Sequence, residues 1–366
     1  MSETPENIES LRREIDACDG EILQLINRRL AVALKIGALK KQQGTGVVDP
    51  DRERNLIRRL ISLNKGPLSN ANLYHLFQEI ITISRAIQQP QLSSGLGPGS
   101  TRVHAVIGNP VAHSLSPLMH NEAFTRLGYD GVYVACRVED IAAAAAGIRA
   151  LNVQGVSVTI PHKVAVMAHL DEIDAQARRI GAVNTIVNRN GSLRGYTTDA
   201  PGAVKALKQK TTVSAKRVFI LGAGGAARAI GHGVVDEGGN VVIVNRSRDR
   251  GEALARELNG EFQPLSELHR IDGEILINTT PLGMLPNYDE IPIDPQILQP
   301  ELVVMDIVYN PPETRLLKEA AAIGCTVIDG VAMFVFQGAL QLELWTGETA
   351  PVEAMQQVVE AALQRL

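Results

Sequence analysis

The 366-residue sequence is poor in cysteine and in aromatic residues. Its three cysteines, Cys18, Cys136 and Cys325, are far apart and form no CxxC pair, which argues against disulfide bonds and against a structural zinc site. Aromatic residues make up 4% of the chain, too few to predict a platform on which nucleic-acid bases would stack. The formal net charge of -4 gives no basic footprint either. We therefore predict no metal and no nucleic acid as partners.

Long apolar runs are also absent from the sequence. No stretch approaches the roughly 18 residues that a membrane-spanning helix needs, and residues 1–7 are polar, so we expect neither a membrane span nor a signal peptide. The cytoplasm is the expected location. Hydrophobic residues make up 45% and charged residues 21%, as in globular proteins, and the length predicts two or three domains.

Residues 5–42 are expected to form one long helix. Apolar residues recur at alternating spacings of three and four, which predicts an apolar seam that packs on another helix. Arg29 occupies a seam position where packing alone would favour leucine, and Lys40 follows about three turns later on the same side. A structural carboxylate could neutralise a lone buried arginine, but two cations on one side favour an anionic ligand. The apolar seam consists of Ile8, Leu11, Ile15, Cys18, Ile22, Leu25, Val32, Ile36 and Leu39.

Two more helices are predicted before residue 90. One begins at Asp49, which suits the N-cap position, and Pro50, which suits the first turn. The other, residues 68–89, has an apolar face that ends in Ser84 and Gln88. Because these polar residues continue a core stripe, we expect hydrogen-bonding groups to point inward.

Four segments of this helical region are distinctive, namely residues 11–19, 27–31, 49–54 and 77–81. Together they resemble the all-helical chorismate mutase family, whose fold is an all-α three-helix domain that forms an intertwined dimer. The resemblance implies that arginines hold the two carboxylates of chorismate while Lys40 and Gln88 act as catalytic residues on the ether oxygen. The other chorismate-binding residues that it implies are Arg12, Arg29, Asp49, Arg52, Glu53 and Ser84.

The spacing of two of these arginines predicts an oligomer. Arg12 and Arg29 are seventeen residues apart, which is roughly 25 Å along a straight helix, too far for both to hold one small dianion. We therefore expect Arg12 to enter the site of a neighbouring chain in a homodimer built on the N-terminal helices. Residues 91–100 are uncharged and rich in Gly, Ser and Pro, so we expect a flexible linker after a domain of residues 1–90.

Strands and helices alternate from residue 101 onward, which predicts parallel α/β units. A strand at residues 156–160 leads to Lys163, which is expected just inside the next helix, where the helix dipole disfavours an ammonium group. Asp199, at the start of a later helix, is the candidate partner, and such a pair suits proton transfer beside a carbonyl. The alternatives are a surface lysine and an aspartate N-cap. Likewise, Ser116 could be an N-cap or could, with Ser114, hold a substrate carboxylate.

A glycine-rich loop follows the strand at residues 216–221. In Gly222-Ala-Gly-Gly-Ala-Ala227, Gly222 permits a tight turn, Gly224 lets a pyrophosphate approach the backbone, and Ala227 allows close packing. The next strand ends near Arg246 and Arg250, which suit a 2'-phosphate. We therefore predict NADP, although surface arginines are common and the intervening aspartate at position 249 argues slightly against it.

The motifs of residues 108–117, 158–163, 181–185, 198–199, 222–227, 245–247, 278–284 and 337–339 together resemble the shikimate dehydrogenase family. The resemblance covers about residues 101–366. It implies a substrate-binding catalytic domain of residues 101–203 and 337–366, and a Rossmann-like NADP-binding domain of residues 204–336. Lys163 and Asp199 would be the catalytic pair. The residues around shikimate would be Ser114, Ser116, Thr159, Asn184, Thr198, Tyr309 and Gln337. Those around NADP would be Gly222, Ala223, Gly224, Gly225, Ala226, Asn245, Arg246, Ser247, Arg250, Thr279, Met284, Gly330 and Met333.

Four positions depart from the usual family pattern. Thr197, Ala200 and Phe336 stand where asparagine, glycine and histidine are usual. Ser157 stands in place of an asparagine, and a hydroxyl is shorter than an amide and has different donors. Recognition of a ring hydroxyl could therefore shift towards quinate or a related acid.

The sequence thus predicts a bifunctional enzyme of aromatic amino-acid biosynthesis. One activity would interconvert 3-dehydroshikimate and shikimate with NADP, and the other would rearrange chorismate to prephenate. In an alternative interpretation, residues 1–90 form a regulatory dimerisation module that binds chorismate or prephenate. The complete polar set favours catalysis, because a sensor need not keep both Lys40 and Gln88.

Overall fold

The computed structural model describes residues 8–43, 50–88, 101–112, 114–285 and 287–364, apart from some side chains of the first helical region. The chain divides into two compact units, residues 1–100 and 101–366, which are described separately. Within the described ranges, no helix is both long enough and apolar enough to cross a membrane.

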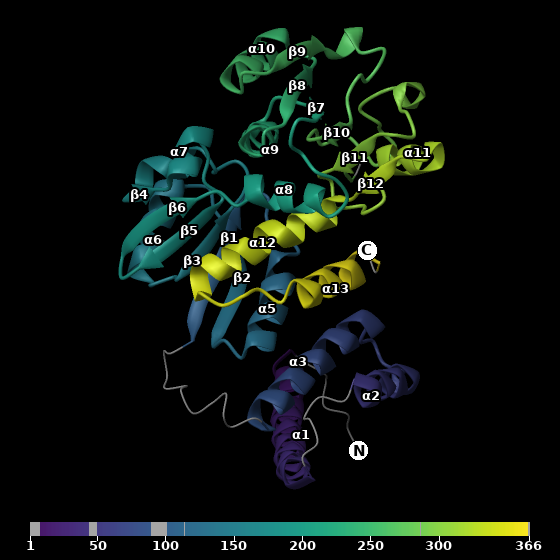
Figure 1. Cartoon of the computed structure of the whole chain (residues 1–366). Coiled ribbons are helices and arrows are strands. Elements are labelled where there is room, and N and C mark those ends of the chain that lie inside the picture. The colour runs from purple at the N-terminus through teal and green to yellow at the C-terminus, as the bar shows by residue number, and fades with distance from the viewer. Residues whose placement is uncertain (1–7, 44–49, 89–100, 113, 286, 365–366) are drawn as a thin grey trace, which may run out of the picture. The chain divides into compact units, whose positions relative to one another are not determined.

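The described residues of the first unit form three helices, as predicted (Figure 1). They are α1 (Ile8–Gln43), α2 (Pro50–Leu63) and α3 (Asn70–Gln88). Helix α3 packs against both α1 and α2. Its small core contains Ala33, Ile57, Leu73, Ile80 and Ile81.

The apolar seam of α1 contributes little to that core. Six of its members, Leu11, Ile15, Ile22, Leu25, Val32 and Leu39, are 43 to 63% exposed. Burying one such side chain contributes roughly 1.5–3 kcal/mol, so a single chain leaves much of the available stabilisation unused. The seam is the part of this unit that a second helix would have to cover.

The second unit begins with a six-stranded sheet in the order β2-β1-β3-β5-β6-β4. Its strands are β1 (Arg102–Gly108), β2 (Gly131–Arg137), β3 (Gly155–Val158), β4 (Glu172–Ile173), β5 (Thr185–Arg189) and β6 (Ser192–Tyr196). Helices α5 (Ser116–Leu127), α6 (Ile141–Ala150) and α7 (Ala175–Ile180) and the 3-10 helix η1 (Ala165–His169) connect them.

The predicted parallel arrangement is confirmed for β1, β2 and β3 but does not extend to β5. Strand β5 runs antiparallel to both β3 and β6. A tight turn at Asn190 and Gly191, which have φ values of 55° and 90°, joins β5 to β6. Asn-Gly with positive φ at both positions favours a two-residue hairpin, which forces neighbouring strands to run in opposite directions.

The second sheet is parallel throughout, with the order β12-β11-β10-β7-β8-β9. Its strands are β7 (Arg217–Leu221), β8 (Asn240–Asn245), β9 (Glu261–Pro264), β10 (Ile275–Asn278), β11 (Val303–Asp306) and β12 (Thr326–Ile328). Apolar clusters cover both of its faces, which explains the continuous Val/Ile/Leu runs of these strands. The flanking helices are α9 (Gly225–Asp236), α10 (Arg248–Glu257) and α11 (Arg315–Ile323), with short 3-10 turns η2 (Leu265–Glu267) and η3 (Pro295–Ile297).

Three further helices complete the second unit. Helix α8 (Asp199–Lys208) lies between them in sequence and packs against both α9 and α12 (Gly330–Thr346), as Figure 1 shows. Helix α13 (Val352–Leu363) packs on α5. Met355 and Val359 therefore share a core with Met119 and Phe124, more than two hundred residues earlier in the chain. The end of the chain thus helps to form the layer that covers the first sheet.

Candidate active sites

Lys163 and Asp199 form an ion pair in the second unit. The Lys163 Nζ atom lies 2.5 Å from Asp199 Oδ2, and both side chains are partly buried. The predicted position of Lys163 inside a helix is wrong, because the lysine lies in a turn two residues before η1 begins at Ala165. The helix dipole therefore does not act on it as proposed. Asp199 is the first residue of α8 rather than its N-cap, which is Thr198.

Asn184 fixes the orientation of the Asp199 carboxylate. Its Nδ2 atom donates to Asp199 Oδ1 at 2.8 Å, which leaves Oδ2 for the lysine. The amide itself is held in one orientation, because its Oδ1 atom accepts the Thr198 backbone N–H at 2.8 Å and the Thr185 hydroxyl at 2.7 Å. The ion pair is therefore part of a preorganised polar network.

The network continues to Gln341 on α12. Its Nε2 atom donates to Thr185 Oγ1 at 3.0 Å, and its Oε1 atom accepts the Ser157 hydroxyl at 2.7 Å. Ser157 in turn accepts the buried Tyr133 hydroxyl at 2.6 Å. Ser157 is thus bound on two sides before any substrate approaches.

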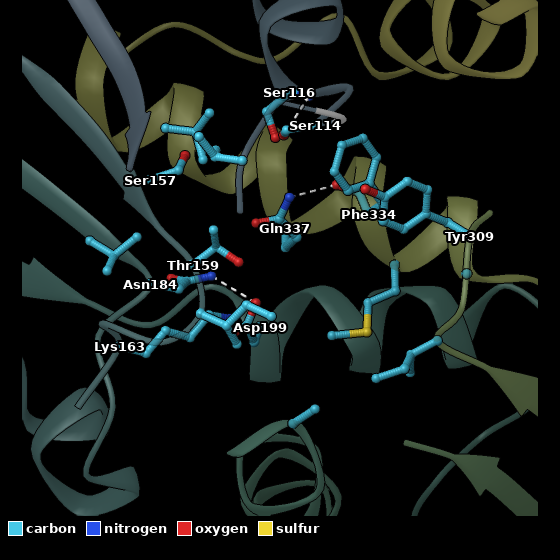
Figure 2. A pocket seen from close by; sticks show the side chains of 18 of the residues that line it. Ser114, Ser116, Ser157, Thr159, Lys163, Asn184, Asp199, Tyr309, Phe334 and Gln337 are labelled. Atoms are coloured by element: carbon cyan, nitrogen blue, oxygen red, sulfur yellow. Dashed lines mark hydrogen bonds and ion pairs between the residues drawn. The ribbon is translucent and has the colours of Figure 1, made fainter. Parts of the chain in front are cut away.

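Five members of this network, Ser157, Lys163, Asn184, Asp199 and Gln341, line a cavity of about 440 Å³. Figure 2 shows Lys163, Asp199 and Asn184 on one side of it and Gln337 on another. Tyr309 stacks on Phe334 with ring centroids 4.6 Å apart, so this pair forms an apolar wall. The remaining predicted substrate residues that line the cavity are Ser114, Ser116 and Thr159.

The structure places one predicted substrate residue differently. Thr198 is buried and does not line the cavity; its hydroxyl accepts a hydrogen bond from Asn184 at 2.9 Å. Phe334 and Gln341 line the cavity but were not predicted. Gln341 lies one helical turn after Gln337 and therefore on the same face of α12, which is the signal that could have revealed it.

A second cavity, of about 250 Å³, lies at the glycine-rich loop. Its lining includes the predicted cofactor residues Gly222, Ala223, Gly224, Asn245, Arg246 and Thr279. Ala226, Met284, Gly330 and Met333 line the larger cavity instead. Gly225, Ser247 and Arg250 line neither of the two, and the neighbouring residues Thr280, Pro281 and Leu282 were not predicted.

The glycine loop fits a pyrophosphate. Gly222 has a φ of 108°, as the predicted tight turn requires. A Cβ atom added to Gly224 or Gly225 would meet nothing within 4 Å, so open space lies directly before the first turn of α9. Unpaired backbone N–H groups at a helix N-terminus favour an anion.

The arginines that follow β8 fit a phosphate on the ribose. Arg248 pairs with Glu252 at 3.1 Å and with Glu267 at 3.6 Å. Within the described residues, Arg246 and Arg250 form no ion pair, and both are exposed. Acidic neighbours thus neutralise Arg248, whereas Arg246 and Arg250 remain available to bind a phosphate.

The structure of the first unit brings Arg29 and Ser84 together. Arg29 Nη1 donates to Ser84 Oγ and, at 3.4 Å, to the Ile80 carbonyl oxygen, and burial lowers the pKa of Arg29. Lys40 is half-buried, whereas Arg12 and Arg52 are exposed. Of the other predicted residues, Asp49 and the side chains of Glu53 and Gln88 lie outside the described residues.

The second unit therefore has the features of a dehydrogenase that uses a nicotinamide dinucleotide, with an acid–base pair beside a small polar cavity. Family models match it in three parts: the shikimate dehydrogenase substrate binding domain over residues 106–186, shikimate / quinate 5-dehydrogenase over 204–280 and the shikimate 5'-dehydrogenase C-terminal domain over 330–360. Chorismate mutase type II matches residues 11–89.

Comparison with individual proteins agrees. The chain is 46% identical over 274 residues to the NADP(+) shikimate dehydrogenase of Geobacillus kaustophilus, covering 72% of this chain and 99% of that protein. The shikimate dehydrogenase of Thermus thermophilus, solved with NADP(H) and shikimate, is 37% identical with a TM-score of 0.68, covering 72% and 100% of the two chains. A 5-ketofructose reductase of Gluconobacter is 38% identical with a TM-score of 0.68, covering 72% and 99%.

The chain belongs to the shikimate dehydrogenase family and carries a chorismate mutase type II domain at its N-terminal end. The predictions of a bifunctional oxidoreductase and isomerase and of NADP as cofactor are confirmed.

Proposed function

We propose that Lys163 and Asp199 carry out the proton transfer in the NADP-dependent interconversion of 3-dehydroshikimate and shikimate. The observation that carries this proposal is the 2.5 Å ion pair at the wall of the larger cavity. NADPH bound at the glycine loop would supply the hydride that reduces the substrate's carbonyl carbon. In the same direction the Lys163 ammonium gives a proton to the carbonyl oxygen, and in the reverse direction the neutral amine takes the hydroxyl proton. Asp199 accepts a hydrogen bond from the lysine and so fixes the position of its Nζ atom.

The remaining polar residues of the cavity would bind the substrate. Ser114 and Ser116 lie together at the start of α5, where two hydroxyls can hold a carboxylate. Thr159 and Gln337 provide donors and acceptors for ring hydroxyls, whereas the amide of Asn184 lines the cavity but already forms four hydrogen bonds within the protein.

A matched pair of lysine variants tests the proton transfer. Lys163→Met should lower kcat by roughly 10²- to 10⁴-fold, because it removes the proton donor. Lys208→Met is the control, because Lys208 pairs with Glu237 at 2.6 Å in a similar ion pair outside the lining of the cavity. Equal activity of the two variants with shikimate and NADP+ would contradict the proposed role.

We propose shikimate as the main substrate, with quinate as the alternative that Ser157 raises. The similarity to a 5-ketofructose reductase means that the fold alone does not choose between polyols. Comparison of initial rates with shikimate and quinate decides the matter, and a clear preference for quinate would refute this assignment.

We also propose that Arg29, Ser84, Lys40 and Gln88 act in the rearrangement of chorismate to prephenate by residues 1–90. The support is the Arg29–Ser84 contact and the half-buried Lys40 on the same helix, because such donors can stabilise charge that develops as the ether bond breaks. Loss of chorismate should be measured for the wild type, Lys40→Ala and Gln88→Ala. Activity that is lost in both variants supports catalysis, whereas a folded wild type without activity would leave the regulatory alternative.

The exposed apolar seam supports a homodimer through the N-terminal helices. Arg12 makes no ion pair within the described residues, as expected if its partner is a ligand held by a second chain. Ile15→Glu, at a seam position that is 59% exposed, should convert the dimer to a monomer in analytical ultracentrifugation. Leu151→Glu is the control, since Leu151 is 77% exposed in the other unit. Dissociation by both variants, or by neither, would contradict a dimer held by the seam.

We also propose domain boundaries within the second unit and a location for the protein. The division into residues 101–203 with 337–366 and residues 204–336 is supported by the packing of α13 on α5, although α12 crosses the second boundary. A cytoplasmic location is supported by the absence of disulfides among the three cysteines. Limited proteolysis and cell fractionation test these two proposals.

A further inference from the structure

Asp306, the last residue of β11, is a buried carboxylate that the proposed chemistry does not use. Its side chain is 0% exposed, and within the described residues no cation pairs with it. Burial raises the pKa of Asp306 to about 6. Three donors stabilise its ionised form: Asn278 Nδ2 at 3.0 Å, the Val308 N–H at 3.1 Å and the Thr314 hydroxyl at 2.7 Å.

The first of these donors organises the loop that follows β10. Asn278 ends that strand and pairs directly with Asp306 in the sheet register. Its Oδ1 atom accepts both the backbone N–H and the hydroxyl of Thr280, at 3.0 and 2.7 Å. The loop that this fixes supplies part of the lining of both cavities: residues 279–282 line the cofactor cavity, and Met284 lines the substrate cavity.

The other two donors organise the loop that follows β11. The Val308 N–H holds the backbone between Ile307 and Tyr309, which both line the substrate cavity. Thr314 is the N-cap of α11, so its bond to Asp306 ties the far end of this loop to the sheet. The Thr314 side chain also lies beside Gly283, where an added Cβ would come within 3.5 Å.

We propose that Asp306 is a positioning residue which, with Asn278 and Thr314, holds the two loops in one arrangement so that the cofactor and substrate cavities form together. This inference rests on the proposed function only for the identity of the substrate. A leucine could fill the same space without desolvating a charge, so packing gives no reason for a carboxylate here. Its particular capacity is to accept three donors from three different segments at once.

The experiment compares Thr314→Val and Asp306→Leu with Thr314→Ser. Removing one hydrogen bond to a buried carboxylate loosens both loops, so Thr314→Val should raise KM for NADP+ and for shikimate by roughly 5- to 10-fold each. The kcat should change less than about twofold, because Lys163 and Asp199 keep their contacts. Thr314→Ser retains the hydroxyl and should restore both KM values. Asp306→Leu should have a larger effect in the same direction.

Val304→Ala controls for a merely structural effect, because Val304 is buried on the same strand and has no polar role. The two variants are compared under conditions in which both have lost the same free energy of unfolding. If Val304→Ala then raises both KM values as much as Thr314→Val does, the proposal is overturned. It is also overturned if only kcat falls, or if folded Thr314→Val keeps both KM values. Calorimetric binding of NADP+ separates this inference from the proposed function. A wild type that fails to oxidise shikimate would refute shikimate as the substrate. The NADP+ affinities of the variants would still decide the role of Asp306.

Discussion

Two buried histidines should make the second unit sensitive to acid. His104 on β1 and His120 on α5 are 0% exposed, and none of their ring nitrogens has a hydrogen-bond partner within the described residues. Burial lowers the pKa of His104 to about 4, and burial together with the nearby His104 lowers the pKa of His120 to about 3. Both side chains are therefore neutral in the folded protein at every pH above 5.

The magnitude follows from proton linkage. A histidine of the unfolded chain binds a proton below pH 6.5, whereas these two bind one only near their folded values. A depressed folded pKa means that stability is complete above pH 6.5 and falls as the pH decreases towards 4 and 3. At pH 5 the loss is set by the pKa of histidine in the unfolded chain, which lies about 1.5 units above that pH. Each histidine therefore lowers the free energy of unfolding by about 2 kcal/mol. Together they remove roughly 4 kcal/mol, a large share of a typical stability of about 5–15 kcal/mol.

The assay is urea unfolding at pH 7 and at pH 5, followed by tryptophan fluorescence. Trp345 is the chain's only tryptophan, and its ring centroid lies 5.4 Å from that of His104 and 5.1 Å from that of His120. In His120→Leu, the loss of stability between the two pH values should shrink by about 2 kcal/mol, whatever the substitution does at pH 7. His269→Leu, at an exposed position, is the control and should leave the loss unchanged. An unchanged loss in His120→Leu would refute the assignment of acid sensitivity to the buried imidazoles.

Three further predictions follow from the polar networks. Arg246→Ala should raise KM for NADP+ by roughly 10-fold and leave KM for NAD+ nearly unchanged, because only NADP+ carries the 2'-phosphate; equal effects in steady-state assays would contradict this. Thr185→Val should lower kcat severalfold with little change in KM for shikimate, since Asn184 loses one of the donors that fix its amide, and Thr185→Ser should restore the rate. Asp306→Asn should stabilise the protein relative to the wild type, because the wild-type carboxylate has a raised pKa of about 6 in the folded protein. A raised folded pKa means that the stability present below the unfolded pKa of about 3.8 is lost as the pH rises through about 6. The difference in the free energy of unfolding, measured with urea, should grow from near zero at pH 4 to on the order of 3 kcal/mol at pH 7.

Local patterns were sufficient to predict most of the architecture. The spacing of the apolar seam predicts α1, because a helical period is visible within one segment. The glycine loop is equally local, since the turn at Gly222 and the open space at Gly224 depend on only a few neighbouring residues. By contrast, the hairpin at Asn190 and Gly191 was missed although its turn signal was present.

Contacts between distant segments explain what the sequence could not reveal. The expected helix at Lys163 is a turn instead, and the backbone carbonyl of Lys163 accepts the N–H of Val183, twenty residues later, at 2.9 Å. Gln341 was overlooked for a related reason. Its spacing from Gln337 places it on the same face of α12, but its hydrogen-bond partners, Ser157 and Thr185, lie more than 150 residues earlier and are not visible in that local pattern.

Ser157 shows how such contacts change a prediction about specificity. From the sequence, this serine is a shorter replacement for an amide and could form or lose any bond to a ring hydroxyl. In the structure its only proton is donated to Gln341, and one of its lone pairs accepts the Tyr133 hydroxyl. The remaining capacity of Ser157 is to accept one hydrogen bond. A substrate hydroxyl at this wall must therefore donate to Ser157 and cannot accept from it. Any discrimination between shikimate and quinate here depends on the direction of this one hydrogen bond, and the contacts of Ser157 with Tyr133 and Gln341 impose that direction.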